Sequence, residues 1–136
     1  MEKIARECHQ SGVNPSIMGP RPVPAIGQAL ERASLTLTDI DVIELNEAFA
    51  TQSIGVKKLF DLYGIQQDNL YRKTNINSGA IALGHPVGAS WVRITVTLAH
   101  ILRRCGSGTG LAALCVGGGM GVALALKAID SKEGTS

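Results

Sequence analysis

The sequence predicts an α/β fold with a mixed sheet sandwiched between helices, and two patterns carry this prediction. Segments whose apolar residues recur at helical spacing alternate with short segments that are apolar throughout. Strands of the second kind are covered on both faces, so helices are expected on both sides of the sheet. The last two such segments, 111–116 and 122–129, are joined by a glycine-rich stretch, which predicts a final antiparallel hairpin.

The first part of the chain is predicted to contain a loop and a helix. Residues 1–10 include helix-favouring Glu, Lys, Ala and Arg, but the segment is short. Four prolines between Gly12 and Pro24 predict a loop. Apolar residues at helical spacing then predict a helix from about Pro24 to Ala33.

The remaining elements follow from the same patterns. In chain order they are a strand at 41–45, a helix at 47–63 stopped by Gly64, an ordered loop at 75–88 with a short turn at 80–83, a helix at 89–104 and a tight turn at 117–121. Arg103 and Arg104 end the second of these helices, where positive charge suits the negative pole of the helix.

Composition indicates one domain in an ordinary soluble protein. The 136 residues are enough for one buried core, which we expect at 1–130, followed by a frayed tail at 131–136. A net charge of +2 gives no reason to expect a nucleic-acid or membrane partner, and no apolar run is long enough to span a bilayer. Cys8, Cys105 and Cys115 show no paired spacing, which predicts reduced thiols, a cytoplasmic location and no metal site.

Asn46 is the first candidate site residue. It follows a predicted strand, at the edge where α/β sheets place their ligands, and its amide could hold a substrate oxygen or a water. The alternative is a helix cap, because Asn is a good N-cap and Glu47 suits the first turn. The residues by themselves favour the cap.

His85 is the second candidate, and its sequence context is more unusual than that of Asn46. It stands between Gly84 and Pro86, just before a predicted helix, so the imidazole is aimed by a fixed backbone and can be approached closely. A neutral imidazole can take a proton from a thiol or donate a hydrogen bond to an oxyanion. A loop histidine that only caps or packs remains an equal alternative.

Cys115 and the glycines after it form the third candidate. Gly117, Gly118 and Gly119 could present backbone N–H groups to an oxyanion, and a thiol beside them could act as an acid or a base. The alternative is a small core residue, because cysteine on an apolar strand is usually buried. A Walker-type phosphate loop is excluded, since no Gly-Lys-Ser/Thr follows.

Together these segments resemble the thiolase family. Residues 46–50, 79–90 and 115–121 are similar to its three C-terminal signatures in order and spacing, and Met18-Gly19 with 22–25 is similar to a fourth. The resemblance runs from about Ile4 to about Lys127 and implies a thiolase-like C-terminal domain. It also implies a strand near residues 5–8, against the local helix preference, and a first strand that the chain lacks.

The resemblance implies acetyl-CoA C-acetyltransfer, which is the condensation or thiolysis of 3-ketoacyl-CoA, with a coenzyme A thioester as substrate and no bound cofactor. The position that matches His85 activates a nucleophilic cysteine and helps to form an oxyanion hole, which the position matching Asn46 completes through a water. The position that matches Cys115 shuttles a proton, and the backbone N–H at Gly117 contributes to a second hole. The residues that bind coenzyme A are expected to lie mostly outside this chain.

The nucleophile itself is not among these positions. In the family it belongs to an N-terminal half, which we expect to be a missing partner, so that the chain alone is inactive and forms homo-oligomers. The sequence at Cys105 only imitates the surroundings of that nucleophile. A non-catalytic assembly or CoA-binding module is the main alternative. A stand-alone hydrolase or transferase that uses Cys105 or Cys115 with His85 is another.

Three residues depart from the family pattern. Arg21, Ser78 and Trp91 stand where the family has glycine. Trp91 lies at the start of a predicted helix beside His85, and overpacking by so large a side chain could displace His85.

Overall fold

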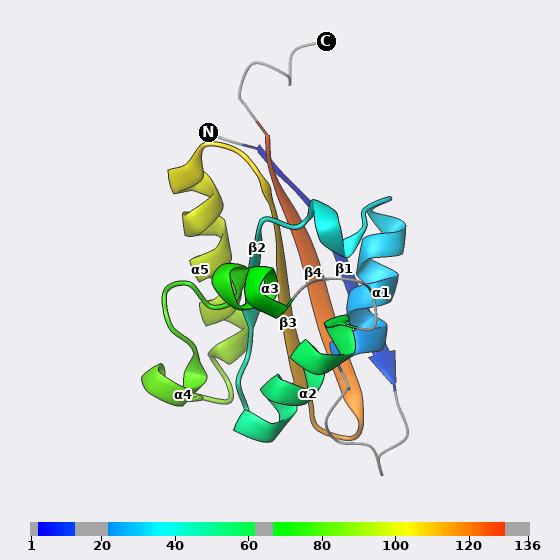
Figure 1. The fold of residues 1–136 in the computed structure, drawn as a ribbon, viewed down its shortest axis with the longest axis vertical. Coiled ribbons are helices and arrows are strands. Elements are labelled where there is room, and N and C mark those ends of the chain that lie inside the picture. Colours follow the sequence, from blue (N-terminus) through cyan, green and yellow to red (C-terminus); the bar gives the residue numbers. More distant parts are fainter. Residues whose placement is uncertain (1–2, 13–21, 62–66, 130–136) are drawn as a thin grey trace.

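A four-stranded mixed sheet forms the centre of the molecule (Figure 1), in the computed structural model that describes residues 3–12, 22–61 and 67–129. Its strands are β1 (Lys3–Gly12), β2 (Val42–Leu45), β3 (Thr109–Val116) and β4 (Met120–Ile129), in the order β1-β4-β3-β2. β2 is parallel to β3, whereas β4 is antiparallel to both of its neighbours. The predicted α/β class and the final hairpin are confirmed.

β1 shows that the helix preference of the first residues is overridden. It pairs with β4 along its whole length, from Lys3 opposite Ile129 to Gly12 opposite Met120. This ladder satisfies the backbone groups along one side of β4, which an isolated helix could not do. The strand implied near residues 5–8 is therefore confirmed. The tail expected at 131–136 lies outside the described residues, and the absence of a first strand stays a prediction.

Helices cover both faces of the sheet. On one face, α1 (Pro22–Arg32), α2 (Ala50–Asp61) and α3 (Gln67–Lys73) pack on inward side chains such as Ile43, Leu45 and Leu111. On the other, α5 (Ser90–Cys105) packs on Val42, Ala112 and Leu124. The alternation of neighbouring strand residues between two buried clusters is the reason that the strands are apolar throughout.

Two helices begin at positions that differ from the prediction. α1 starts at Pro22 rather than at about Pro24, because proline is tolerated in the first helical turn. α2 starts at Ala50 rather than Glu47, which leaves residues 46–49 outside the helix. The expected stop of α2 at Gly64 lies outside the described residues, as does Arg21.

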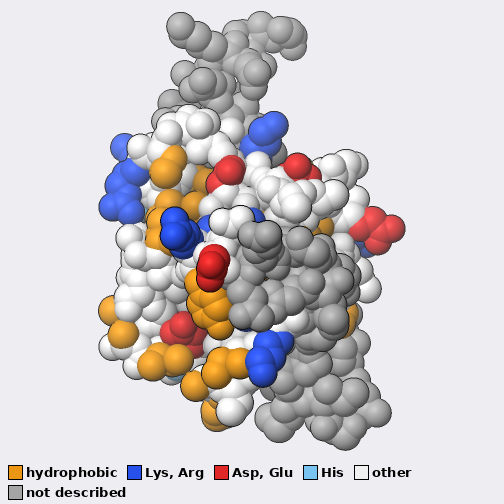
Figure 2. All heavy atoms as spheres, viewed as in Figure 1, with side chains coloured by type: hydrophobic (Ala, Val, Ile, Leu, Met, Phe, Trp, Pro, Cys, Tyr) orange, Lys and Arg blue, Asp and Glu red, His pale blue; other side chains and the backbone are white. Residues whose placement is uncertain are grey.

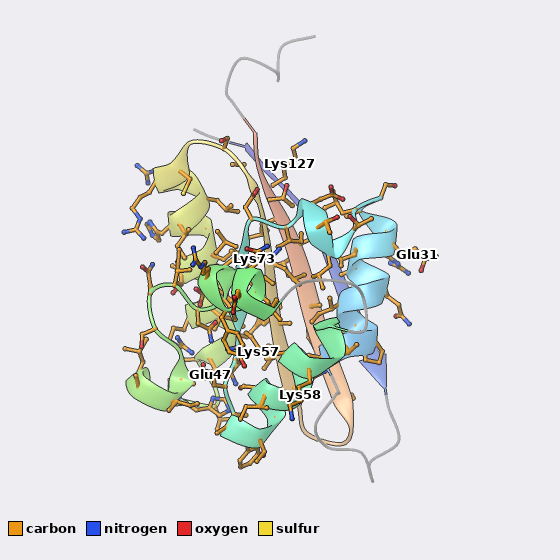
Figure 3. All side chains as sticks on the ribbon, in the orientation of Figure 1. Glu31, Glu47, Lys57, Lys58, Lys73 and Lys127 are labelled. Atoms are coloured by element: carbon orange, nitrogen blue, oxygen red, sulfur yellow. The ribbon has the colours of Figure 1, made fainter. Side chains whose placement is uncertain are left out.

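The short helix α3 has no counterpart in the prediction. Leu70 on this helix is fully buried, and Lys73 at its end donates hydrogen bonds to the carbonyls of Leu37 (3.3 Å) and Ile40 (2.8 Å). These carbonyls lie in and beside η1 (Leu37–Asp39), a 3₁₀ helix. Figure 3 labels Lys73 on α3, facing this connection. The helix is held by a tertiary contact that no local pattern reveals.

The elements around the glycines agree closely with expectation. α4 (Ala80–Leu83) is the expected short turn, and α5 ends at Gly106, whose φ of 73° is left-handed. This conformation favours glycine and explains why the helix stops there. The tight turn is shorter than predicted, at residues 117–119, because β4 already begins at Met120.

Ser78 is expected to destabilise the fold, because its φ of 77° places a side chain in the left-handed region. Ser78→Gly should raise the free energy of unfolding by about 1 kcal/mol, the strain relieved exceeding the added chain entropy. Urea denaturation would measure this. The matched control is Ser107→Gly, an exposed serine without a positive φ, which should give no gain. Equal stabilisation by both changes would contradict the explanation.

Candidate active site

Asn46 lies where the parallel strands β2 and β3 end. Its backbone N–H donates to Ala113 O (2.9 Å), so the pairing continues one residue past β2. The side chain is fully buried, and Nδ2 is 3.5 Å from His85 Nε2. The cap interpretation is wrong, because α2 begins only at Ala50. The structure thus brings together two of the four candidate residues.

His85 is held in one orientation from the other side of its ring. Its Nδ1 lies 2.6 Å from Ser90 Oγ, and this hydroxyl donates its only proton to Pro86 O at 3.0 Å. With its proton on Pro86 O, Ser90 Oγ accepts from Nδ1–H. In this tautomer Nε2 carries a lone pair that faces Asn46 Nδ2. An imidazole in this tautomer presents a base at Nε2.

The loop that carries His85 is held by hydrogen bonds from Asn75 and Glu47. Asn75 donates to Leu45 O (2.9 Å) and accepts from Leu45 N (2.8 Å), which copies a strand pairing with β2. The Glu47 carboxylate accepts from Ile81 N at 3.0 Å and lies so close to Gly79 that a Cβ there would clash. Figure 3 labels Glu47 between α4 and α2. These bonds fix the loop on the strand that ends at Asn46.

Trp91 is accommodated without displacing His85. Its side chain is half-buried and packs against the hydrophobic cluster between α5 and the sheet. Ser90, immediately before it, keeps its bond to the His85 ring. The Trp91 side chain is thus accommodated in the cluster between α5 and the sheet, while the Ser90–His85 contact is kept.

Cys115 is near the same end of the sheet but faces α2. Its Sγ donates to Gln52 Oε1 at 3.4 Å, and the thiol is free and half-buried. Leu111 and Ala113, at alternate positions of β3, face the same side, whereas Asn46 contacts the loop before α5. The side chains of Asn46 and Cys115 thus lie on opposite faces of the sheet. A substrate that contacts both must therefore lie across the edge of the sheet at the carboxyl ends of β2 and β3.

Gly117 and Cys105 are both at the surface. Gly117 is exposed in the hairpin turn, with open space where a Cβ would stand. Cys105 is exposed at the far end of α5 from Ser90, roughly 22 Å along the helix at 1.5 Å per residue. At that separation the Cys105 thiol cannot be deprotonated by His85.

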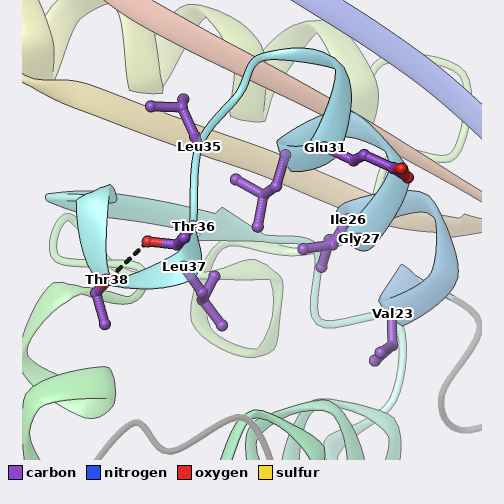
Figure 4. A pocket seen from close by; sticks show the side chains of 9 residues that line it. Val23, Ile26, Gly27, Glu31, Leu35, Thr36, Leu37 and Thr38 are labelled. Carbon is purple, nitrogen blue, oxygen red and sulfur yellow. Dashed lines mark hydrogen bonds between the residues drawn. The ribbon is translucent and has the colours of Figure 1, made fainter.

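Two pockets of the described structure lie away from these residues. One of about 410 Å³ is lined by apolar residues of α1 and η1, among them Ile26 and Leu37, as Figure 4 shows. Another of about 390 Å³ lies between α5 and residues 77–83 and carries Arg93, His100 and Arg104. Neither of these two pockets contains Asn46, His85 or Cys115.

Glu44 places an ionisable group beside the site. It is 1% exposed on β2, two residues before Asn46. Burial raises the pKa of its carboxyl from 4.5 to about 7, with Glu47 adding to the rise and Arg93 opposing it. Both carboxyl oxygens lack a hydrogen-bond partner.

Ser90, Gln52 and Glu44 are site residues that the sequence reasoning missed. Ser90 was noted only as part of a motif, although a serine five residues after a candidate base is a possible partner for it. Gln52 and Glu44 share a stronger signal, since each is a polar residue at a position that the pattern predicts to be buried. Buried polar groups of this kind usually have a partner or a function.

Two other kinds of feature do not occur in the part of the chain that the structure describes. No cluster of His, Cys, Asp and Glu side chains there could hold a metal ion. No helix there has the length and apolar character needed to cross a membrane.

Comparison with known proteins identifies the relatives of this chain. The family described as "Thiolase, C-terminal domain" matches residues 2–128. The chain is 53% identical over 118 residues to an acetyl-CoA acetyltransferase of Syntrophomonas wolfei, covering 87% of the chain and 28% of the relative. It is 50% identical over 117 residues to the mitochondrial 3-ketoacyl-CoA thiolase of Homo sapiens, covering 86% and 28%.

Solved structures agree with the sequence comparison. The chain superposes on the acetyl-CoA acetyltransferase of Bacillus anthracis with a TM-score of 0.82 and 44% identity, over 94% of this chain and 30% of that one. It superposes equally well on human mitochondrial 3-ketoacyl-CoA thiolase in complex with CoA, with 46% identity over 93% and 30%. The chain therefore spans less than a third of the length of these relatives.

Ionisation of buried Glu44 should make the fold less stable as pH rises. The folded chain retains a proton that the unfolded chain releases above about pH 4.5, so stability is lost as pH rises from 4.5 to about 7. The expected loss in the free energy of unfolding is roughly 2 kcal/mol. It is smaller than the free energy that corresponds to the whole pKa difference, because solvent screens part of the charge. Urea denaturation from pH 4.5 to 8 would measure it.

Glu44→Gln should remove most of this slope and should be more stable than the unchanged chain at pH 8. The control is Glu31→Gln, an exposed glutamate on α1, which should leave the slope in place. A slope that survives Glu44→Gln would assign it to other groups.

Proposed function

Because the chain belongs to the thiolase family through its C-terminal domain, we propose that it carries half of an acyl-transfer site for coenzyme A thioesters. The reaction is acetyl-CoA C-acetyltransfer, written as condensation to a 3-ketoacyl-CoA or as its thiolysis. The observation that carries the proposal is the contact between Asn46 Nδ2 and His85 Nε2, in a ring whose tautomer is set by Ser90. A base in fixed orientation beside a buried amide is what thiol activation and oxyanion binding require.

His85 is the proposed base for the attacking thiol. In the thiolysis direction Nε2 takes the thiol proton, and the thiolate adds to the 3-keto carbonyl of the substrate. The imidazolium then has N–H bonds at both nitrogens and can stabilise a negative oxygen. Ser90 would hold the ring in place throughout, because it accepts from Nδ1 in the neutral and the charged state.

Asn46 is the proposed amide of an oxyanion hole. Its Oδ1 is buried and has no hydrogen-bond partner, while Nδ2 is directed at His85. An amide with one free acceptor can bind a water, which in turn can donate to a thioester oxygen as it becomes an enolate. This supports the water-mediated role that the family resemblance implies.

Cys115 is the proposed acid and base at the carbon centre. When the carbon–carbon bond breaks, the enolate of acetyl-CoA takes a proton at its α-carbon from the Cys115 thiol. The thiolate left behind then takes the proton of the incoming coenzyme A. Gln52 would orient the thiol, since its Oε1 accepts from Sγ. The exposed N–H of Gly117 is proposed for the second oxyanion hole.

The missing nucleophile is proposed to come from a separate thiolase N-terminal half, with CoA and acyl-CoA binding mostly outside this chain. A partner surface is supported by large apolar side chains that are exposed next to the site: Phe49, Ile81, Leu83, Val87 and Val92 are 58–81% exposed. Figure 2 shows hydrophobic side chains gathered over α4 and α2 on one face of the molecule. Exposed apolar patches mark association sites, and the same surface would support homo-oligomers.

A thiolysis assay tests the proposal, by following loss of acetoacetyl-CoA with added coenzyme A. We expect no turnover from the chain alone and measurable turnover once a thiolase N-terminal half is added. In that mixture His85→Ala should lower the rate by about 10²–10⁴, the usual contribution of a general base, and Cys115→Ser should do likewise.

The matched control is Cys105→Ser, which removes an exposed thiol outside the site and should leave the rate unchanged. Turnover by the chain alone would contradict the missing nucleophile. Stable association with the half but no turnover would favour the alternative of a non-catalytic assembly or CoA-binding module, which the exposed apolar side chains also support.

A further inference from the structure

Glu44 and Arg93 form a second polar layer directly beside the Asn46–His85 contact. Glu44 and Asn46 are alternate residues along β2 and its continuation, so both side chains face α5, as Val42 does. Arg93 comes three residues after Ser90 on α5, which places it on the same side of the helix, one turn further along. The two elements that carry Asn46 and the partner of His85 therefore also carry these two charges.

The Glu44 carboxylate is shut off from solvent, whereas Arg93 is half-buried and also lines the pocket between α5 and residues 77–83. The Glu44 side chain is 1% exposed, and neither of its carboxyl oxygens has a partner. Nε and Nη2 of Arg93 are also buried without a partner. Two acceptors and two donors of opposite charge thus remain unpaired between packed elements. A buried water needs two to four such polar partners, so this arrangement suits one that bridges the pair.

Stability does not explain this pair. Ile94, Leu98 and Ile101 of α5 already pack on the sheet in a buried cluster. An ion pair at such a position often contributes less than apolar residues of the same size would, because both charges lose their hydration. What the pair can supply is a directional contact, which apolar packing lacks.

We propose that Glu44 and Arg93, bridged by buried water, are a positioning pair that fixes α5 against β2 and so holds His85 Nε2 against Asn46. The proposed link runs from Glu44 through the bridging water to Arg93, along one helical turn to Ser90, and through Ser90 Oγ to His85 Nδ1. The inference deepens the proposed function and rests on it only for the role of His85 as a base. Neither residue touches the reacting atoms.

Nitrogen-15 NMR of the histidine rings tests the pair on the whole chain and needs no turnover. The chain has only three histidines, His9, His85 and His100, and the signals missing from His85→Asn assign the ring of interest. In the unchanged chain, the His85 shifts should report the Nδ1–H tautomer. In Glu44→Gln, the shifts of His85 Nδ1 and Nε2 should both move toward the average of their values in the two tautomers. Circular dichroism should show that this variant is still folded.

Arg93→Met should move the His85 shifts in the same direction, and the double variant should move them no further than either single one, because each change breaks the same link. Where Arg93→Met alone does not fold, the double variant, which leaves no unpaired charge, replaces it. The matched control is Thr95→Val, which removes another buried unpartnered polar atom of α5. It should leave the His85 shifts unchanged.

A purely structural role predicts a different result. Loss of a structural support would lower stability together with the His85 signal, whereas Glu44→Gln is expected to raise stability at pH 8 and still release the ring. Unchanged His85 shifts in Glu44→Gln would overturn the inference. So would equal shifts in Thr95→Val, or additive shifts in the double variant. Because no outcome depends on acyl transfer, absence of turnover in the mixture with a thiolase N-terminal half would count against the proposed function alone.

Discussion

Parallel pairing of β2 with β3 brings the carboxyl ends of two strands to one edge of the sheet, and the bond from Asn46 N to Ala113 O carries that pairing one residue further. The candidate site depends on this alignment. It places Asn46 beside the end of the strand that carries Cys115, although the two are far apart in sequence. Because neighbouring strand residues face opposite sides, the same alignment separates the two side chains across the edge. A reaction that involves both Asn46 and Cys115 is therefore possible only beyond the carboxyl ends of β2 and β3.

The second requirement is a rigid loop between β2 and α5. Asn75 continues the sheet by pairing with Leu45, Glu47 binds the backbone of Ile81, and Ser90 holds the imidazole of His85. The contacts of Asn75 and Ser90 are partly buried, so breaking one of them would leave a polar group that is poorly hydrated and has no partner. Rigidity of this kind is useful in catalysis, because a base must be held within a fraction of an ångström of its substrate.

A half-site of this design explains two features that would be unusual in a complete enzyme. The site residues lie at the carboxyl ends of β2 and β3, outside two pockets of the described structure, and exposed apolar side chains of α4 and α5 border them. Both features are expected where a second body completes the site. The span of less than a third of the relatives' length fits the same explanation.

The sequence by itself determined most of the fold. Uniformly apolar strands and helical spacing predicted the sheet, its two layers of helices and the final hairpin, because these patterns reflect which faces are buried. It failed at residues 3–12, where local propensity favours a helix but a ten-residue ladder with β4 prevails. It also missed α3, which is held by burial of Leu70 and by bonds from Lys73 to a distant connection.

For the site, the sequence identified Asn46, His85, Cys115 and Gly117 as residues able to do chemistry, but it could not choose between function and packing at any of them. Only the tertiary structure rejected the cap at Asn46, set the tautomer of His85 through Ser90, and gave Cys115 a partner in Gln52. It alone showed that the Glu44 carboxylate and two nitrogens of Arg93 are buried without hydrogen-bond partners. The physical reason is that residue type fixes what a group can donate or accept. Which partner it meets depends on contacts between segments that are remote in sequence, and those exist only once the sheet has formed.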